Sequence, residues 1–135
     1  MKILAIDDSN SARYVLIKIL RELGYKEITA VESAEDGLQN CKLKAFDLIL
    51  LDWNLGGMSG LEFLKRIRAD PTLKKIAVIM ITTVNERNQV MQALKLGIQG
   101  YFFKPVSKEM MEAKLRELEA RILAGSERPS APPAV

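Results

Sequence analysis

Residues 48–54, Leu-Ile-Leu-Leu-Asp-Trp-Asn, place four consecutive apolar side chains directly before an acidic residue. A run this short that is apolar on both faces is typical of a strand buried inside a parallel sheet. The chain has four more short runs of this kind, at Ile3–Ile6, Ile28–Val31, Ile76–Ile81 and Tyr101–Phe103. We therefore predict five strands.

The segments between these runs carry apolar residues at helical spacing. The clearest predicted helix extends from about Ser11 to Leu23, and Gly24 follows it as a stop signal. Four further helices are expected: one at the capping box Ser33–Asp36, one at the capping box Ser59–Glu62, one from Asn85 to near Gly97, and one after Ser107.

Strands buried on both faces and separated by helices must be parallel and covered on both sides. The predicted fold class is therefore α/β, a (βα)5 doubly wound five-stranded parallel sheet. From Gly125 onward the chain has three of its five prolines and no helical periodicity. We expect residues 1–124 to form the domain and residues 125–135 a Pro/Ser/Ala-rich disordered tail.

Composition limits the possible functions. The 135 residues, 48% of them apolar, suffice for one core. The apolar runs are far shorter than the roughly 20 residues of a membrane span, and Asp7 and Asp8 interrupt any N-terminal signal sequence. Basic residues exceed acidic ones by only three and are interspersed with them, which disfavours direct DNA binding. We expect a cytoplasmic protein.

Histidine is absent and Cys41 is the single cysteine, so the sequence offers no thiolate cluster, no imidazole base and no intrachain disulfide. We interpret Cys41 as a small core residue. Any chemistry must therefore rest on carboxylates, hydroxyls and lysine.

Polar side chains follow four of the five predicted strands, at Asp7-Asp8, Asp52, Thr82-Thr83 and Lys104-Pro105. In an open parallel sheet, ligands bind at the carboxyl ends of the strands, so these residues should converge on one rim. Three crowded carboxylates would repel one another unless a cation neutralised them. Oxygen ligands without histidine indicate Mg²⁺, or alternatively Mn²⁺.

Asp52 beside such an ion has what a phosphoryl acceptor needs. Its carboxylate is the nucleophile, and the Lys104 ammonium and the Thr82 hydroxyl can stabilise charge on the phosphoryl oxygens. The residues thus predict an acyl phosphate on Asp52.

Four motifs follow one another along the chain: Asp7-Asp8, Leu51-Asp52-Trp53-Asn54, Thr82 and Gly100-Tyr101-Phe102-Phe103-Lys104-Pro105. Their order and spacing resemble the response-regulator receiver family of two-component signalling, over roughly residues 2–123. Within that family, Asp52-Trp53-Asn54 and Tyr101 favour the chemotaxis or motility type.

The resemblance implies that Asp52 accepts a phosphoryl group from a histidine kinase. It also implies that Asp8 and Asp52 bind the cation, that Asp7 assists through water, and that the backbone carbonyl of Asn54 is a further ligand. The flavodoxin-like strand order 2-1-3-4-5 follows from the resemblance as well, since chemotaxis receivers have this order.

By the same resemblance, Thr82 and Lys104 contact the phosphoryl group, Tyr101 changes rotamer on activation, and the Lys104–Pro105 bond is cis. Phosphorylation would then alter the face formed by helix four, strand five and helix five, where an output protein binds. The protein would catalyse only its own phosphorylation and dephosphorylation. Gly56, where the family often has proline, predicts a more mobile loop.

Two other functions fit parts of the pattern. A Mg²⁺-dependent phosphotransferase or phosphatase also works through an aspartyl phosphate, but needs a second carboxylate near the nucleophile, where Asn54 offers an amide. A pseudo-receiver that only binds proteins would lack one or more of the rim residues. Trp53 is expected to be a partly exposed aromatic with no chemical role.

Overall fold

All five predicted strands lie in one parallel sheet in the computed structural model, which describes residues 1–124. The strand order is β2-β1-β3-β4-β5, which confirms the expected doubly wound topology. The predicted disordered tail, residues 125–135, lies outside the described residues. The strands are β1 (Lys2–Ile6), β2 (Glu27–Val31), β3 (Leu48–Asp52), β4 (Ala77–Thr82) and β5 (Gly100–Phe103).

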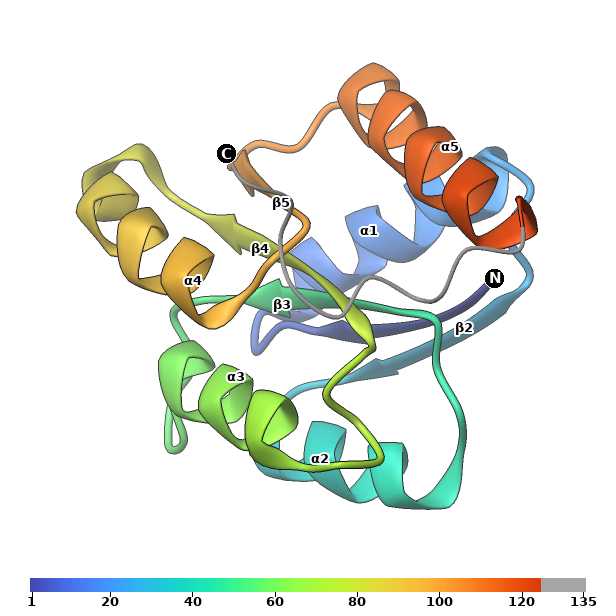
Figure 1. Cartoon of the computed structure of the whole chain (residues 1–135). Helices are drawn as coiled ribbons and strands as arrows, with labels where there is room; N and C mark the ends of the chain where they lie inside the picture. Colours follow the sequence, from blue (N-terminus) through green and yellow to red (C-terminus); the bar gives the residue numbers. More distant parts are fainter. Residues whose placement is uncertain (125–135) are drawn as a thin grey trace.

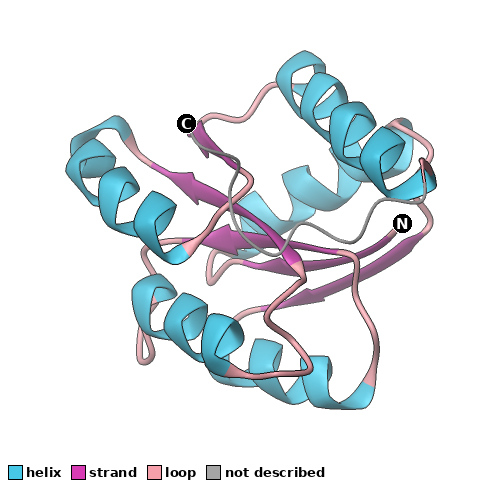
Figure 2. Ribbon diagram, in the orientation of Figure 1, coloured by secondary structure: helices cyan, strands magenta, loops and turns pink. Residues whose placement is uncertain are grey.

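Helices cover both faces of the sheet, with α1 and α5 on one side and α2, α3 and α4 on the other (Figures 1 and 2). Within residues 1–124, no helix combines the length and apolar character that crossing a bilayer would require. The helices are α1 (Asn10–Glu22), α2 (Ala34–Leu43), α3 (Gly60–Ala69), α4 (Val90–Leu96) and α5 (Lys108–Leu123).

Alternate residues of each strand divide the core into two layers, because successive side chains of a strand point to opposite faces. Ile3 and Ala5 of β1 pack with α1 and α5, whereas Leu4 and Ile6 pack with α2, α3 and α4. Cys41 is buried in the second layer, as expected for a small core residue. This packing holds the carboxyl ends of the strands at one edge.

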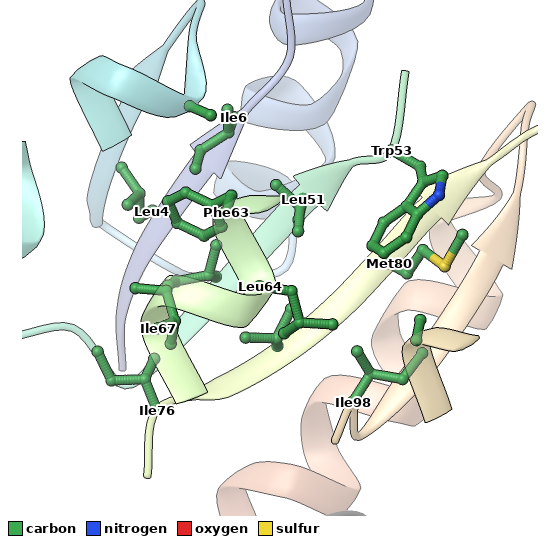
Figure 3. Close-up of a cluster of buried hydrophobic side chains, with 14 of the residues drawn as sticks. Leu4, Ile6, Leu51, Trp53, Phe63, Leu64, Ile67, Ile76, Met80 and Ile98 are labelled. Atoms are coloured by element: carbon green, nitrogen blue, oxygen red, sulfur yellow. The ribbon is translucent and has the colours of Figure 1, made fainter. Parts of the chain in front are cut away.

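The expectation of a partly exposed Trp53 is wrong, because only 4% of its surface is accessible. The indole lies in the second core layer beside Met80 and near the start of α3 (Figure 3). Gly60, the first residue of α3, makes room for it: a Cβ atom there would lie 2.9 Å from Trp53 Cε3. Hydrophobic patterning does not reveal that this glycine admits the ring.

The predicted helix from Asn85 is two elements. A 3₁₀ helix, η1 (Val84–Gln89), precedes α4, so the segment that leaves β4 is wound more tightly than predicted. At the starts of α2 and α3, the Ser33 and Ser59 hydroxyls accept hydrogen bonds from backbone amides at 3.0 and 3.1 Å. The serine half of each predicted capping box is therefore present.

Arg68, near the end of α3, joins segments at the edge of the sheet away from the polar rim. Its Nη1 atom donates to the carbonyls of Lys74 at 2.9 Å and Ile76 at 2.7 Å, just before β4. Its Nε atom donates to the carbonyl of Gly97, just after α4, at 2.9 Å, and Nη2 donates to Oε1 of Gln99 at 3.3 Å. Burial lowers the pKa of the guanidinium to about 10. Through these hydrogen bonds Arg68 fixes the connection between α4 and β5.

Candidate phosphoryl-transfer site

The polar residues predicted at the strand ends lie together at the carboxyl edge of the sheet. Asp7 directly follows β1, Asp52 ends β3, Thr82 ends β4, and Lys104 directly follows β5. Asp7, Asp52 and Thr82 are each exposed by 3% or less, so the site is set into the rim, while Asp8 is exposed. Parallel pairing of β1, β3, β4 and β5 produces this convergence.

Carboxylate oxygens of Asp7, Asp8 and Asp52 lie within 4.8 Å of one another. Oδ1 of Asp7 accepts a hydrogen bond from the backbone amide of Ser9 at 2.9 Å. Oδ2 of Asp7 is buried and has no hydrogen-bond partner among the described residues. Because buried carboxylate oxygens need compensation, this oxygen and its neighbours fit a hard divalent cation.

Lys104 supplies the positive charge next to the carboxylates. Its Nζ atom lies 3.4 Å from Oδ2 of Asp52 and 3.5 Å from Oδ2 of Asp7. Burial lowers the pKa of Lys104, but the two carboxylates outweigh this effect and raise it overall, so the ammonium stays charged. The Lys104–Pro105 peptide bond is cis, as expected, and the Lys104 amide donates to the carbonyl of Thr82 at 2.7 Å.

The carboxyl group of Asp52 is harder to ionise than an ordinary aspartate. Burial and the negative charge of Asp7 raise its pKa to about 6, against the opposing effect of Lys104. The backbone amide of Asn54 also favours the charged form, because it donates to Oδ1 of Asp52 at 3.3 Å. The Asn54 residue itself is exposed at the start of the following loop. A cation at the site would favour the nucleophilic carboxylate form.

Thr82 and Tyr101, the two predicted switch residues, both lie on the β4–β5 side of the site. The Thr82 hydroxyl donates to Oε1 of Glu86 at 2.7 Å. The Tyr101 ring is 44% exposed and makes an edge-to-face contact with Phe103, with ring centroids 5.6 Å apart. Tyr101 therefore faces outward from the rim.

Glu86 is a residue of the site that the sequence analysis does not identify. Thr83 and Glu86 have the spacing of a capping box, in which the acid at the third helical position reaches back to the residue before the helix. The 3₁₀ turn of η1 brings the Glu86 carboxylate back to the end of β4, where it also accepts from Thr83 Oγ1 at 3.1 Å. The capping-box spacing of Thr83 and Glu86 is the signal that the sequence offers.

Comparison with known proteins agrees with the site. Residues 3–116 match the family model described as the response regulator receiver domain. The chain is 36% identical to chemotaxis protein CheY-3 of Vibrio cholerae serotype O1 over 122 residues, which cover 90% of this chain and 94% of that protein. It is 32% identical to chemotaxis protein CheY of Pseudomonas aeruginosa, with 90% and 98% covered.

Solved structures show the same fold. A response regulator from Chloroflexus aurantiacus superposes with a TM-score of 0.83 at 26% identity, covering 89% of this chain and 98% of that one. Chemotaxis protein CheY4 of Vibrio cholerae gives a TM-score of 0.78 at 29% identity, with 86% and 96% covered. The fold, the rim and the sequence matches agree: this chain belongs to the response regulator receiver domain family.

Proposed function

We propose that the protein is a signalling switch in which Asp52 accepts a phosphoryl group from a histidine kinase. The observation that carries the proposal is the buried Asp52 carboxylate, which lies beside the Lys104 ammonium and within reach of the other two rim carboxylates. This arrangement combines a nucleophile with fixed positive charge, which phosphoryl transfer requires.

In the proposed transfer, an Oδ atom of Asp52 forms a bond to phosphorus while the bond from phosphorus to the donor's imidazole nitrogen breaks. The electron pair of that bond stays on the nitrogen. Lys104 holds the carboxylate in place and then offers its ammonium to a phosphoryl oxygen. Thr82, whose hydroxyl donates to Glu86 in this structure, would offer that hydroxyl to another phosphoryl oxygen.

The proposed cofactor is Mg²⁺, or alternatively Mn²⁺, held by Asp8, Asp52 and the Asn54 carbonyl, with Asp7 acting through water. When bound, it would neutralise the carboxylates and the phosphoryl charge. The buried Asp7 Oδ2 atom, which has no hydrogen-bond partner among the described residues and only the Lys104 ammonium beside it at 3.5 Å, supports this assignment together with the all-oxygen donor set.

We further propose that the face formed by α4, β5 and α5 meets the output protein. Met91 of α4, Tyr101 of β5 and Met110 of α5 are exposed by 60%, 44% and 57%. Large apolar side chains exposed on three adjoining elements suit a protein contact. Phosphorylation would change this face through Thr82 and Tyr101 and so control binding of the partner.

Phosphorylation of the full chain by acetyl phosphate tests the proposal. We expect a mass increase of one phosphoryl group in the presence of Mg²⁺ and none after chelation with EDTA. Asp52→Asn should abolish the increase, whereas Asp36→Asn, at an exposed acid on α2, should leave it intact. Incorporation that persists in Asp52→Asn would refute the assignment.

A further inference from the structure

One carboxylate oxygen holds both hydroxyls at the end of β4. Oε1 of Glu86 accepts from Thr82 Oγ1 at 2.7 Å and from Thr83 Oγ1 at 3.1 Å, and the Thr83 amide lies 3.4 Å from the same atom. Thr82 is buried, whereas Glu86 is partly exposed in η1. Nothing in the proposed phosphoryl transfer requires this acid.

We propose that Glu86 is a latch that competes with the phosphoryl group for the Thr82 hydroxyl, an inference that rests on the proposed function of Asp52. A threonine hydroxyl has a single proton to donate. While Thr82 donates to Glu86, it therefore cannot donate to a phosphoryl oxygen. The latch thus stabilises the unphosphorylated conformation, and Thr82 must leave Glu86 when the switch is activated.

Electrostatic repulsion should favour release of the latch when Asp52 is phosphorylated. A phosphoryl group brings a charge of about −1.5 to −2 at neutral pH. Lys104 forms ion pairs with Asp7 and Asp52, so it is directed at the acceptor. Glu86 would face the added negative charge across the Thr82 hydroxyl, and repulsion between them favours breaking the Thr82–Glu86 hydrogen bond.

Release of the latch would also reach the output face. The same Glu86 oxygen is bonded to Thr83, which caps the start of η1, and η1 leads directly into α4. Losing the Thr82 bond would detach Glu86 from the end of β4 and leave it held only at the start of η1, by Thr83. Glu86 would therefore link occupancy of the phosphoryl site to the position of α4.

Because coupling is reciprocal, removing the latch should tighten binding of a phosphoryl mimic. The test is a titration of the full chain with beryllofluoride at saturating Mg²⁺, followed by the fluorescence of Trp53, which adjoins Asp52. We expect Glu86→Ala to bind roughly fivefold more tightly than wild type, within the usual range of coupling between sites. Glu86→Gln, which keeps an acceptor but loses the charge, should lie between them. Arg87→Ala, at an exposed neighbour in η1, is the matched control and should equal wild type.

A double-mutant cycle with Thr82→Ala separates the latch from a simple loss of negative charge. In the Thr82→Ala background, Glu86→Ala should tighten binding by clearly less than fivefold, because no hydroxyl remains to be released. An equal gain in both backgrounds, or no gain in the wild-type background, would overturn the latch. If Glu86 were merely structural, Glu86→Ala would lower the melting temperature of the protein without tightening the binding of beryllofluoride. Wild type that fails to bind beryllofluoride with Mg²⁺ would refute the proposed function itself.

Discussion

An ion pair between Lys104 and Asp52 spans the end of β4. The two residues follow or end β5 and β3, which lie on either side of β4, and Nζ of Lys104 lies 3.4 Å from Oδ2 of Asp52. The pair therefore connects the proposed acceptor to the strand that carries Tyr101. Any group added to Asp52 must change this contact.

Lys104→Ala should leave Asp52 able to accept a phosphoryl group but uncouple it from the α4, β5 and α5 face, because the ammonium is the proposed link. The changes in NMR amide shifts of residues 90–103 on addition of beryllofluoride would measure how strongly the site is coupled to this face. We expect the shifts of the variant to be much smaller than those of wild type. Lys108→Ala, which removes an exposed ion pair with Glu22, is the control. Equal shifts in Lys104→Ala and wild type would contradict the linking role.

Asp52→Asn should stabilise the protein in EDTA at pH 7, by about 1–3 kcal/mol, because it removes a buried charge next to Asp7. The folded pKa of Asp52, about 6, lies above its ordinary value of 3.8, so the folded state binds the proton more tightly. The stability that protonation confers is complete below pH 4 and is lost as the pH rises through 6. In urea denaturation, the difference in the free energy of unfolding between variant and wild type should therefore widen from pH 4 to pH 7. A constant gap would show that Asp52 titrates normally.

Asp8→Ala should weaken Mg²⁺ binding by roughly tenfold or more, since it removes one of the proposed charged oxygen ligands. Its exposure means that folding should change little. Titration with Mg²⁺, followed through Trp53 fluorescence, gives the affinity. Glu109→Ala, at an exposed acid on α5, should titrate like wild type, and an unchanged curve for Asp8→Ala would remove Asp8 from the site.

The phosphoryl group on Asp52 should be long-lived, because hydrolysis needs a water in line with phosphorus. Val84 is 53% exposed and cannot orient that water by hydrogen bonding, and the Thr83 side chain is expected to narrow access to the phosphoryl group. The double variant Thr83→Ala/Val84→Glu should lose phosphate about tenfold faster, or about 1.4 kcal/mol in the barrier. Decay of radiolabelled protein after removal of the donor, at constant Mg²⁺, provides the rates. Equal decay, or faster decay in wild type, would show that these positions do not control the water.

The sheet and the rim were predictable because they depend on patterns that tertiary packing reinforces, whereas the strand order was implied only by the resemblance to the receiver family. Five short apolar runs, each buried by helices on both faces, define the strands, and a parallel sheet brings their carboxyl ends together. Asp7, Asp52 and Lys104 were found because they end or follow strands.

The errors share a different cause. The burial of Trp53 depends on the missing side chain of Gly60, and the bond from Thr82 to Glu86 depends on the path of the backbone from β4 into η1. Both depend on local backbone geometry, which hydrophobic periodicity does not report.

Arg68→Met should lower the free energy of unfolding by about 2–4 kcal/mol, because it leaves several partly buried carbonyls without a donor. Arg66→Met is the matched control on the same helix. Arg66 is exposed and, among residues 1–124, pairs with the exposed Glu62, so its loss should change stability by about 0.5 kcal/mol or less. Urea denaturation of both variants measures the difference. Similar values for the two would show that the Arg68 contacts contribute little.

The Arg68 contacts also determine how α4 can move. Its guanidinium binds the carbonyl of Gly97 at the end of the helix. The start of the helix is connected through η1 to the end of β4, where Thr82 donates to Glu86. A body held at one end turns about that end. With seven residues, α4 is about 10 Å long, so a rotation of about 15° would carry its free end by roughly 2.5 Å while Gly97 stays still. We therefore expect α4 to swing as a lever with its fulcrum at Gly97, and Val90 to travel farther than Leu96.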